Sequence, residues 1–387
     1  MPFNDNTRFW VVFDTCTIRE YYQDVHNLIA LPSGTTIRYE YREKYLSPAA
    51  VRAASNPETA PASVLLVYAQ WNRYVRGNDA PPRSTPSSEI LWVPTRFAEM
   101  QLIPPAEGAN YFFDFKVLSY PKLDQTALMR ILNPVITANE VPFNKWVCLS
   151  DDFQAFEALR RGTESENWQA IVDTLGTPPM QFSADTFMRL KGPFYGSRGG
   201  ILPPKYKQEK QTVDNKMQVR KVISLYELVE NEEYSFEVIS HSPAPSSARA
   251  GAVIQRRLEV QPEKDGPIIV LGNPRLDLRQ YTGQIIKFKA KRYEEMDQKT
   301  GSIRLDTGLL PDNWPVGANF LLLFRIKKKA LKAIIALLTG VAAAVLLLFA
   351  TKLWDKNPVF GVAAAVVGLF LTVITILLLT GKLSFKL

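Results

Sequence analysis

The residue types that most often carry out chemistry in proteins are scarce in this chain. It has two histidines, His26 and His241, and two cysteines, Cys16 and Cys148. Neither histidine has a second histidine or a cysteine at the spacing of a zinc site, so no metal site is predicted. We interpret both histidines as surface residues. Cys16 follows a predicted strand at the start of a helix, where a thiol can be activated, but a structural role is favoured for both cysteines.

Carboxylates offer one further pattern. Asp114 and Lys116, on a predicted strand, resemble the Asp-x-Lys half of a metal-dependent nuclease site. Alternating charge on an exposed strand face gives the same pattern, and this second interpretation is favoured. Asp124 and the pair Asp151 and Asp152 are expected to begin helices. A Ser–His–Asp triad stays open as an alternative, although the Gly-x-Ser-x-Gly elbow that would indicate one is missing. We therefore predict no catalytic residue and no cofactor, and favour a protein that is not an enzyme.

A glycine-rich run at 196–200 lacks the lysine and hydroxyl residue of a phosphate-binding P-loop. We expect residues 192–210 to form a linker. The alternative is a flexible basic loop that contacts a phosphate or a protein partner, because four cations gather there: Arg198, Lys205, Lys207 and Lys210. Mixed aromatic and basic stretches at 38–42 and 71–76 could stack bases, but strands facing a core are favoured.

The last sixty or so residues are of a different kind. Residues 333–351 contain nineteen positions without a charge, and residues 359–381 contain twenty-three more. As a helix, each stretch is long enough to cross a hydrocarbon layer of about 30 Å. The short segment 352–358 between them is too short for a domain. The sequence therefore predicts a transmembrane hairpin.

Charge gives the predicted orientation. The chain carries a net charge of +8, of which +7 falls after residue 326, so the first 326 residues carry only +1. That balance argues against direct nucleic-acid binding. The positive-inside rule places the N-terminal region and the C-terminus in the cytoplasm, with two passes through the inner membrane. The lysines before the first span could also attract anionic phospholipid: Lys327, Lys328, Lys329 and Lys332.

The predicted spans contain no ionisable side chain, which argues against a carrier or a proton relay. Small residues recur there at a spacing of four, which lets helices approach closely. We expect them to pack inside one hairpin; contact between protomers, giving a homo-oligomer, is the alternative. The residues concerned are Gly340, Ala344, Gly361, Ala365 and Gly368.

The residues before the hairpin divide into three predicted parts. Residues 1–149 read as a β-rich α+β domain, with helices at 18–30, 48–55 and 124–132. Residues 150–211 read as a helical connector with helices at 151–161, 166–175 and 183–190, followed by the linker. Residues 212–326 read as a β-sandwich or barrel, because short strands alternate with turn residues. With few cysteines and no apolar segment after Met1, a reducing compartment is expected.

This layout, a β-rich cytoplasmic region followed by a two-helix hairpin with a basic collar, resembles membrane effectors of prokaryotic antiviral defence. These include effectors linked to cyclic-nucleotide signalling or to short Argonautes, and the resemblance lies in the layout alone. It implies a protein whose soluble part binds a cytoplasmic partner or ligand and whose hairpin then perturbs the membrane. Two other classes stay open: an adaptor that tethers a partner without harm to the membrane, and a membrane-bound hydrolase.

Overall fold

The computed structural model describes residues 8–15, 19–54, 62–71, 90–103, 110–139, 145–176, 186–196, 199–213, 216–242, 257–278, 283–307, 317–354 and 357–379. The chain forms two compact units. The first comprises Met1–Glu227, Glu233–Lys289 and Thr300–Arg325, and the second comprises Leu228–Glu232, Ala290–Lys299 and Ile326–Leu387.

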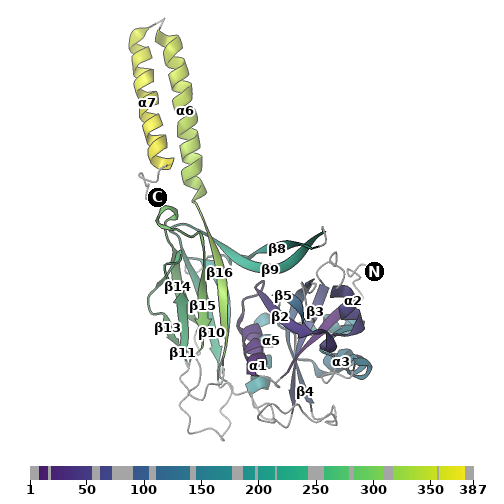
Figure 1. The fold of residues 1–387 in the computed structure, drawn as a ribbon. Coiled ribbons are helices and arrows are strands. Elements are labelled where there is room, and N and C mark those ends of the chain that lie inside the picture. The colour runs from purple at the N-terminus through teal and green to yellow at the C-terminus, as the bar shows by residue number, and fades with distance from the viewer. Residues whose placement is uncertain are drawn as a thin grey trace. The chain divides into compact units, whose positions relative to one another are not determined.

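The N-terminal part of the first unit is built on a six-stranded sheet (Figure 1), in the order β2-β5-β4-β3-β1-β6. The central strand pair β1 and β3 is parallel, and the other described pairings are antiparallel. Both central strands are continuous apolar runs, as expected for strands covered on both faces, and their side chains are almost fully buried. The strands are β1 (Phe9–Thr15), β2 (Thr36–Arg42), β3 (Ala62–Trp71), β4 (Ile90–Ile103), β5 (Asn110–Val117) and β6 (Val147–Ser150).

The helices described in this part are α1 (Arg19–Ala30), α2 (Pro48–Ala54), α3 (Gln125–Asn139), α4 (Phe153–Leu159) and α5 (Glu164–Gly176). Asp124 and Asp152 begin α3 and α4 as predicted, because each carboxylate accepts a hydrogen bond from the backbone N–H three residues later. The predicted end of α3 at residue 132 is wrong. The helix continues through Pro134 because Ile131, Leu132 and Val135 are all buried, which offsets the cost of a missing hydrogen bond, about 3 kcal/mol.

The rest of the first unit contains two further sheets. The four-stranded sheet has the order β12-β14-β10-β7, and the six-stranded sheet has the order β13-β11-β15-β16-β9-β8. Both are open, so the predicted alternative of a closed barrel is wrong. The strands are β7 (Phe187–Tyr195), β8 (Lys205–Val213), β9 (Lys216–Val229), β10 (Glu233–His241), β11 (Arg257–Pro262), β12 (Ile268–Leu271), β13 (Arg275–Asp277), β14 (Gln284–Ala290), β15 (Thr300–Asp306) and β16 (Asn319–Lys327).

Aromatic rings join these two sheets. Phe324 of β16 lies edge-on to Phe288 of β14, with ring centroids 5.6 Å apart, and to Phe236 of β10, at 6.3 Å. Tyr226 of β9 lies 5.8 Å from the same Phe324 ring. Such ring contacts add about 0.5–1.5 kcal/mol each beyond the area they bury, so this cluster holds the two sheets face to face.

Two predictions about the connector are wrong. The described part of the predicted helix 183–190 lies in strand β7, and the predicted linker 192–210 contains the end of β7 and most of β8. Phe187, Met188 and Leu190 are buried, and β7 pairs with β10 along its length. Pairing with a distant strand therefore overrides the local helical pattern.

The second unit contains the two C-terminal helices, α6 (Ala330–Trp354) and α7 (Pro358–Leu379), which run antiparallel (Figure 1). It also contains the segment 228–232, residues 326–329 and the segment 290–299, which includes a 3₁₀ turn at Tyr293–Glu295. Only Lys328 and Lys329 separate the end of β16 from the start of α6.

Candidate functional site: a helix pair and its charged collar

The contact between α6 and α7 follows a spacing of seven residues. A Cβ atom added to Gly368 would lie 2.9 Å from Leu347 Cγ, and one added to Gly361 would lie 3.0 Å from Trp354 Cα. One added to Gly340 would lie 3.5 Å from Thr375 Cγ2. The three pairs, which we call the seam, are therefore Gly340–Thr375, Leu347–Gly368 and Trp354–Gly361.

The predicted small residues thus have different positions. Gly361 and Gly368 are buried in the seam, whereas Ala344 is exposed and Ala365 is half-buried. Near Gly340 the seam gains a polar contact, because Thr375 Oγ1 donates to Thr339 Oγ1 at 2.8 Å. The small residues therefore allow close approach of the backbones of α6 and α7 to each other, within the pair.

The outward faces of both helices are apolar and exposed. Leu348 is 69% exposed and Phe370 is 65% exposed. The other large apolar side chains exposed there are Leu338, Val341, Val345, Phe349, Trp354, Val359, Phe360, Val362, Val366, Val367, Leu369, Val373 and Ile376. A soluble monomer seldom exposes a continuous apolar patch larger than a few hundred Å², so this surface favours contact with lipid or with another chain.

By length and composition, one described segment is able to cross a membrane: Pro358–Ile376 in α7, of which 11% is buried. Such low burial distinguishes it from the core helix of a soluble protein. In α6 the apolar segment found among the described side chains is the shorter Leu338–Lys352. The structure therefore indicates membrane association through α7, and the two-pass hairpin stays a prediction.

The predicted basic cluster is paired with acidic residues of the same unit. Lys329 Nζ lies 2.8 Å from Glu232 Oε1, and Lys328 Nζ lies 3.9 Å from Glu294 Oε1. The side chain of Lys332 lies outside the described residues. We call residues 228–232, 290–299 and 326–329 the collar. The charges of the collar nearly balance, since five carboxylates accompany six cations.

Glu230 organises the collar. Its side chain is 4% exposed, and its carboxylate accepts hydrogen bonds from the backbone N–H groups of Tyr293 at 2.8 Å and Lys329 at 3.0 Å. The backbone N–H of Glu230 donates to the carbonyl of Lys327. The segment Lys327–Lys329 offers no Ser, Thr, Asp or Asn to cap α6, so Glu230 supplies a cap from a distant part of the chain.

Tyr293 lies between two lysines of the collar. Its ring centroid is 4.3 Å from Lys299 Nζ and 5.1 Å from Lys328 Nζ. Each contact is a cation–π interaction, worth about 0.5–1 kcal/mol when exposed. The segment 290–299 is therefore held against the start of α6 by both a carboxylate and a ring.

The predicted basic loop divides between described and undescribed residues. Arg198 lies outside the described residues. Lys205, Lys207 and Lys210 all lie exposed on β8, which is an edge strand of its sheet. Lysines on an edge strand discourage pairing with another chain, and this explains their position without a ligand.

The residues considered for catalysis have structural partners. Asp114 is 3% exposed; its carboxylate accepts two hydrogen bonds from Arg38, at 2.7 and 2.9 Å, and one from Val222 N at 2.6 Å. It therefore joins β5 to β2 and β9 and does not resemble an open metal ligand. Cys148 is buried, and burial raises the pKa of its thiol to about 12. Cys16 lies outside the described residues.

The prediction that His26 lies on the surface is wrong. It is buried, its ring stacks on Phe187 with centroids 5.3 Å apart, and burial lowers its pKa to about 3. His241 is partly covered, and its Nε2 lies 2.6 Å from Asp173 Oδ1 of α5. Both histidines therefore help to join helices to β7 and β10.

Several buried polar groups were not predicted from the sequence, among them Asp14 and Arg96. Asp14, at the end of β1, accepts a hydrogen bond from Tyr39 Oη at 2.9 Å, and its burial raises its pKa well above the usual range. Arg96 is fully buried with its Cζ atom 3.6 Å from the centroid of the Tyr120 ring. In sequence, Asp14 lies near the end of β1 and Arg96 lies in the middle of β4, and no nearby residue indicates the partner of either.

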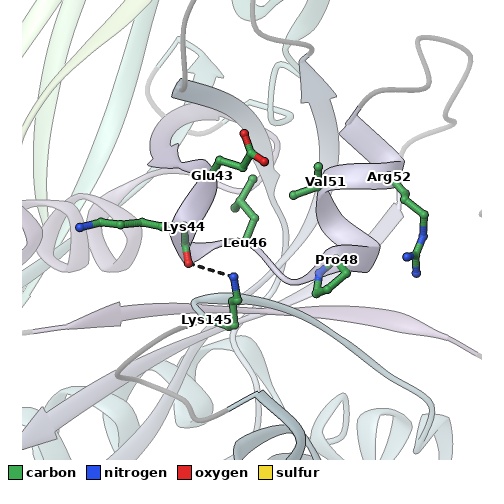
Figure 2. A pocket seen from close by; sticks show the side chains of 7 residues that line it. All are labelled: Glu43, Lys44, Leu46, Pro48, Val51, Arg52 and Lys145. Atoms are coloured by element: carbon green, nitrogen blue, oxygen red, sulfur yellow. Dashed lines mark hydrogen bonds between the residues drawn. The ribbon is translucent and has the colours of Figure 1, made fainter. Parts of the chain in front are cut away.

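Figure 2 shows a shallow hollow of about 640 Å³ beside α2. Its lining combines an apolar floor with three cations and one acid: Glu43, Lys44, Leu46, Pro48, Val51, Arg52 and Lys145. The Lys44 and Arg52 side chains extend away from one another, and Lys145 Nζ donates to the Lys44 carbonyl at 3.0 Å. The cations therefore do not converge on a single ligand.

Within the described ranges, no three His, Cys, Asp or Glu side chains form a group that could hold a metal ion. Compared with known proteins, the chain matches no family model, no curated protein and no solved structure. Of all the features above, the helix pair and its collar have the clearest functional character.

Proposed function

We propose that this chain is a membrane-anchored binding protein, whose helix pair enters the cell membrane and whose β-rich region faces the cytoplasm and carries a partner or ligand. The exposed apolar surface of α6 and α7 carries the proposal. In water, this apolar surface would stay exposed, at a free-energy cost of about 25 cal/mol for each Å². In a bilayer, lipid chains would cover it. The uncharged run 333–351 in the sequence is the reason to extend the proposal to two passes.

Two forms of this function differ in what the helix pair does. In the first, binding clusters several hairpins and permeabilises the membrane, as in the antiviral effectors whose layout the chain resembles. In the second, the helix pair is an anchor for an adaptor. One observation favours the anchor: Gly361 and Gly368 are occupied within the pair, which leaves the exposed Ala344 as the outward member of the predicted small-residue motifs.

Insertion and topology can be tested together on the full chain. In a background without Cys16 and Cys148, Asn357→Cys places a thiol in the turn and Thr300→Cys places one in the β-rich region. We expect resistance to alkaline extraction, labelling of Asn357→Cys by a membrane-impermeant maleimide added to intact cells, and labelling of Thr300→Cys only after lysis. Release of the chain by alkali would overturn the proposal, and an unlabelled turn would overturn two passes.

The two forms separate in a second experiment. Residues 330–379 are replaced by an unrelated two-helix anchor, and membrane potential and partner binding are measured with both chains. An adaptor retains its function after the swap, whereas an effector loses its effect on membrane potential.

A further inference from the structure

We propose that residues 290–299, which we call the Tyr293 loop, form a binding surface for the headgroups of anionic phospholipids. This inference rests on the membrane insertion proposed above and extends it to a segment far from the helices in sequence. The occupant is the phosphate of a lipid in the same bilayer that receives the helix pair.

Position is the first argument. A single carboxylate, that of Glu230, binds the backbone N–H of both Tyr293 and Lys329. Lys329 is the residue before α6, so the Tyr293 loop lies beside the point where α6 begins. Thr375 contacts Thr339 in the first half of α6, so the end of α7 lies on the same side of the helix pair as the start of α6. When the helices are in lipid, the loop is therefore at the depth of the headgroups.

Charge is the second argument. The lysines expected from sequence to bind lipid are partly neutralised, since Glu294 pairs with Lys328 and Glu232 pairs with Lys329. The Tyr293 loop adds Lys291 and Arg292 next to them. Arg292 is 61% exposed at its side chain and lies 3.8 Å from Glu295, which is itself 60% exposed. Such an exposed pair is worth little, so a phosphate can displace it.

Side-chain chemistry is the third argument. A guanidinium group binds phosphate oxygens through two parallel hydrogen bonds, which a lysine does not provide. Tyrosine is enriched at the boundary between lipid and water because its ring is apolar and its hydroxyl is polar. Tyr293 and Arg292 are adjacent in the loop, so one short segment offers both features.

The test uses full-length protein purified in a neutral detergent and titrated with phosphatidylglycerol, with phosphatidylcholine in parallel; native mass spectrometry measures bound lipid. The variant Lys291→Gln/Arg292→Gln removes the two loop cations. Each cation at an anionic surface is worth about 1 kcal/mol, or about fivefold, so the double variant is expected to weaken phosphatidylglycerol binding about 30-fold.

Two controls make the result specific. Lys207→Gln/Lys210→Gln removes the same charge from the exposed edge strand β8 and is expected to change binding less than twofold. Arg275→Gln/Glu259→Gln removes an exposed ion pair of the β-rich region without changing the net charge and is expected to have an equally small effect. Thermal unfolding of each variant checks that the fold is retained.

The inference is overturned if wild-type protein binds both lipids equally, if the Lys291/Arg292 variant keeps its affinity, or if the β8 variant loses as much. A chain that resists alkaline extraction yet shows no preference for phosphatidylglycerol would refute this inference alone. A chain released by alkali would refute the proposed function itself.

Discussion

Phe13 in β1 and Phe370 in α7 are the same residue type in opposite surroundings: the first is 0% exposed and the second is 65% exposed. Around Phe13, strands, helices and the edge of the Trp92 ring supply a complete apolar shell. Around Phe370, the described chain supplies α6 on one side only. The first region is thus stable through its own packing, whereas the second needs a medium or a partner that the chain does not provide.

The sharpest way to test this difference is to truncate both rings. Phe13→Ala is expected to lower the free energy of unfolding of the β-rich region by about 3–5 kcal/mol, because it leaves a cavity in a packed core. Phe370→Ala, the matched control, is expected to leave that stability unchanged. Denaturant unfolding of the full chain in detergent measures both; equal losses would contradict the comparison.

A buried and an exposed carboxylate allow the same comparison between covered and uncovered side chains. Asp114→Asn removes the charge that a buried carboxylate offers to Arg38 and is expected to cost about 3 kcal/mol or more, as for a broken buried ion pair. Glu294→Gln removes a carboxylate from an exposed pair and is expected to cost less than about 1 kcal/mol. Unfolding curves of the two variants give both values, and a small loss for Asp114→Asn would show that its three hydrogen bonds are not structural.

A charge on the outer face of α7 tests whether that face enters lipid. An arginine near the centre of a membrane helix costs about 2.5–3.5 kcal/mol, so Val366→Arg is expected to shift the chain strongly from the membrane to the soluble or aggregated fraction. Val366→Leu is the control. If the helix pair were in water, Val366→Arg would instead leave the distribution unchanged.

Packing within the helix pair predicts a smaller effect. Gly368→Leu places a side chain where Leu347 already lies and is expected to destabilise the pair by about 1–3 kcal/mol. Ala344→Leu adds a larger side chain at an exposed position and is expected to be neutral. Cross-linking between cysteines introduced at Thr339 and Thr375 reports the pair; if Ala344→Leu weakens it more, contact between protomers is indicated.

The smallest expected effect comes from His26. Its pKa falls from 6.5 to about 3 on folding, so below pH 6.5 the unfolded chain binds a proton that the folded chain rejects. Stability is therefore fully present above pH 6.5 and lost as pH falls, by about 1.4 kcal/mol at pH 5.5. Denaturant unfolding at pH 7.5 and pH 5.5 measures this loss, and His26→Phe is expected to remove it.

Local patterns predicted much of the first region. Apolar runs and alternation predicted a β-rich N-terminal region, and acidic residues located the starts of α3 and α4. The strand order and the parallel pairing of β1 with β3 were not accessible, because they depend on contacts between distant segments. Strand β7 was mistaken for a helix for the same reason: its buried residues match a helical spacing until β10 is placed beside them.

The candidate site shows the same limit. The apolar character of the two helices and the lysines before them are evident from sequence. Glu230, in contrast, lies in an acidic segment whose sequence suggests an exposed turn. Its partners Tyr293 and Lys329 lie 63 and 99 residues further along the chain. Burial of Asp14 beside Tyr39 was missed in the same way, since the two residues are separated by a helix and a turn.

The seam between α6 and α7 places a condition on the turn that joins them. Each helical residue advances the chain by about 1.5 Å and rotates it by about 100°. One residue inserted between Trp354 and Pro358 would thus turn Gly361 and Gly368 away from their partners together, and bring bulkier neighbours inward. The length of this connection therefore sets the rotational register of α6 and α7, and we expect insertions between Trp354 and Pro358 to weaken the helix pair.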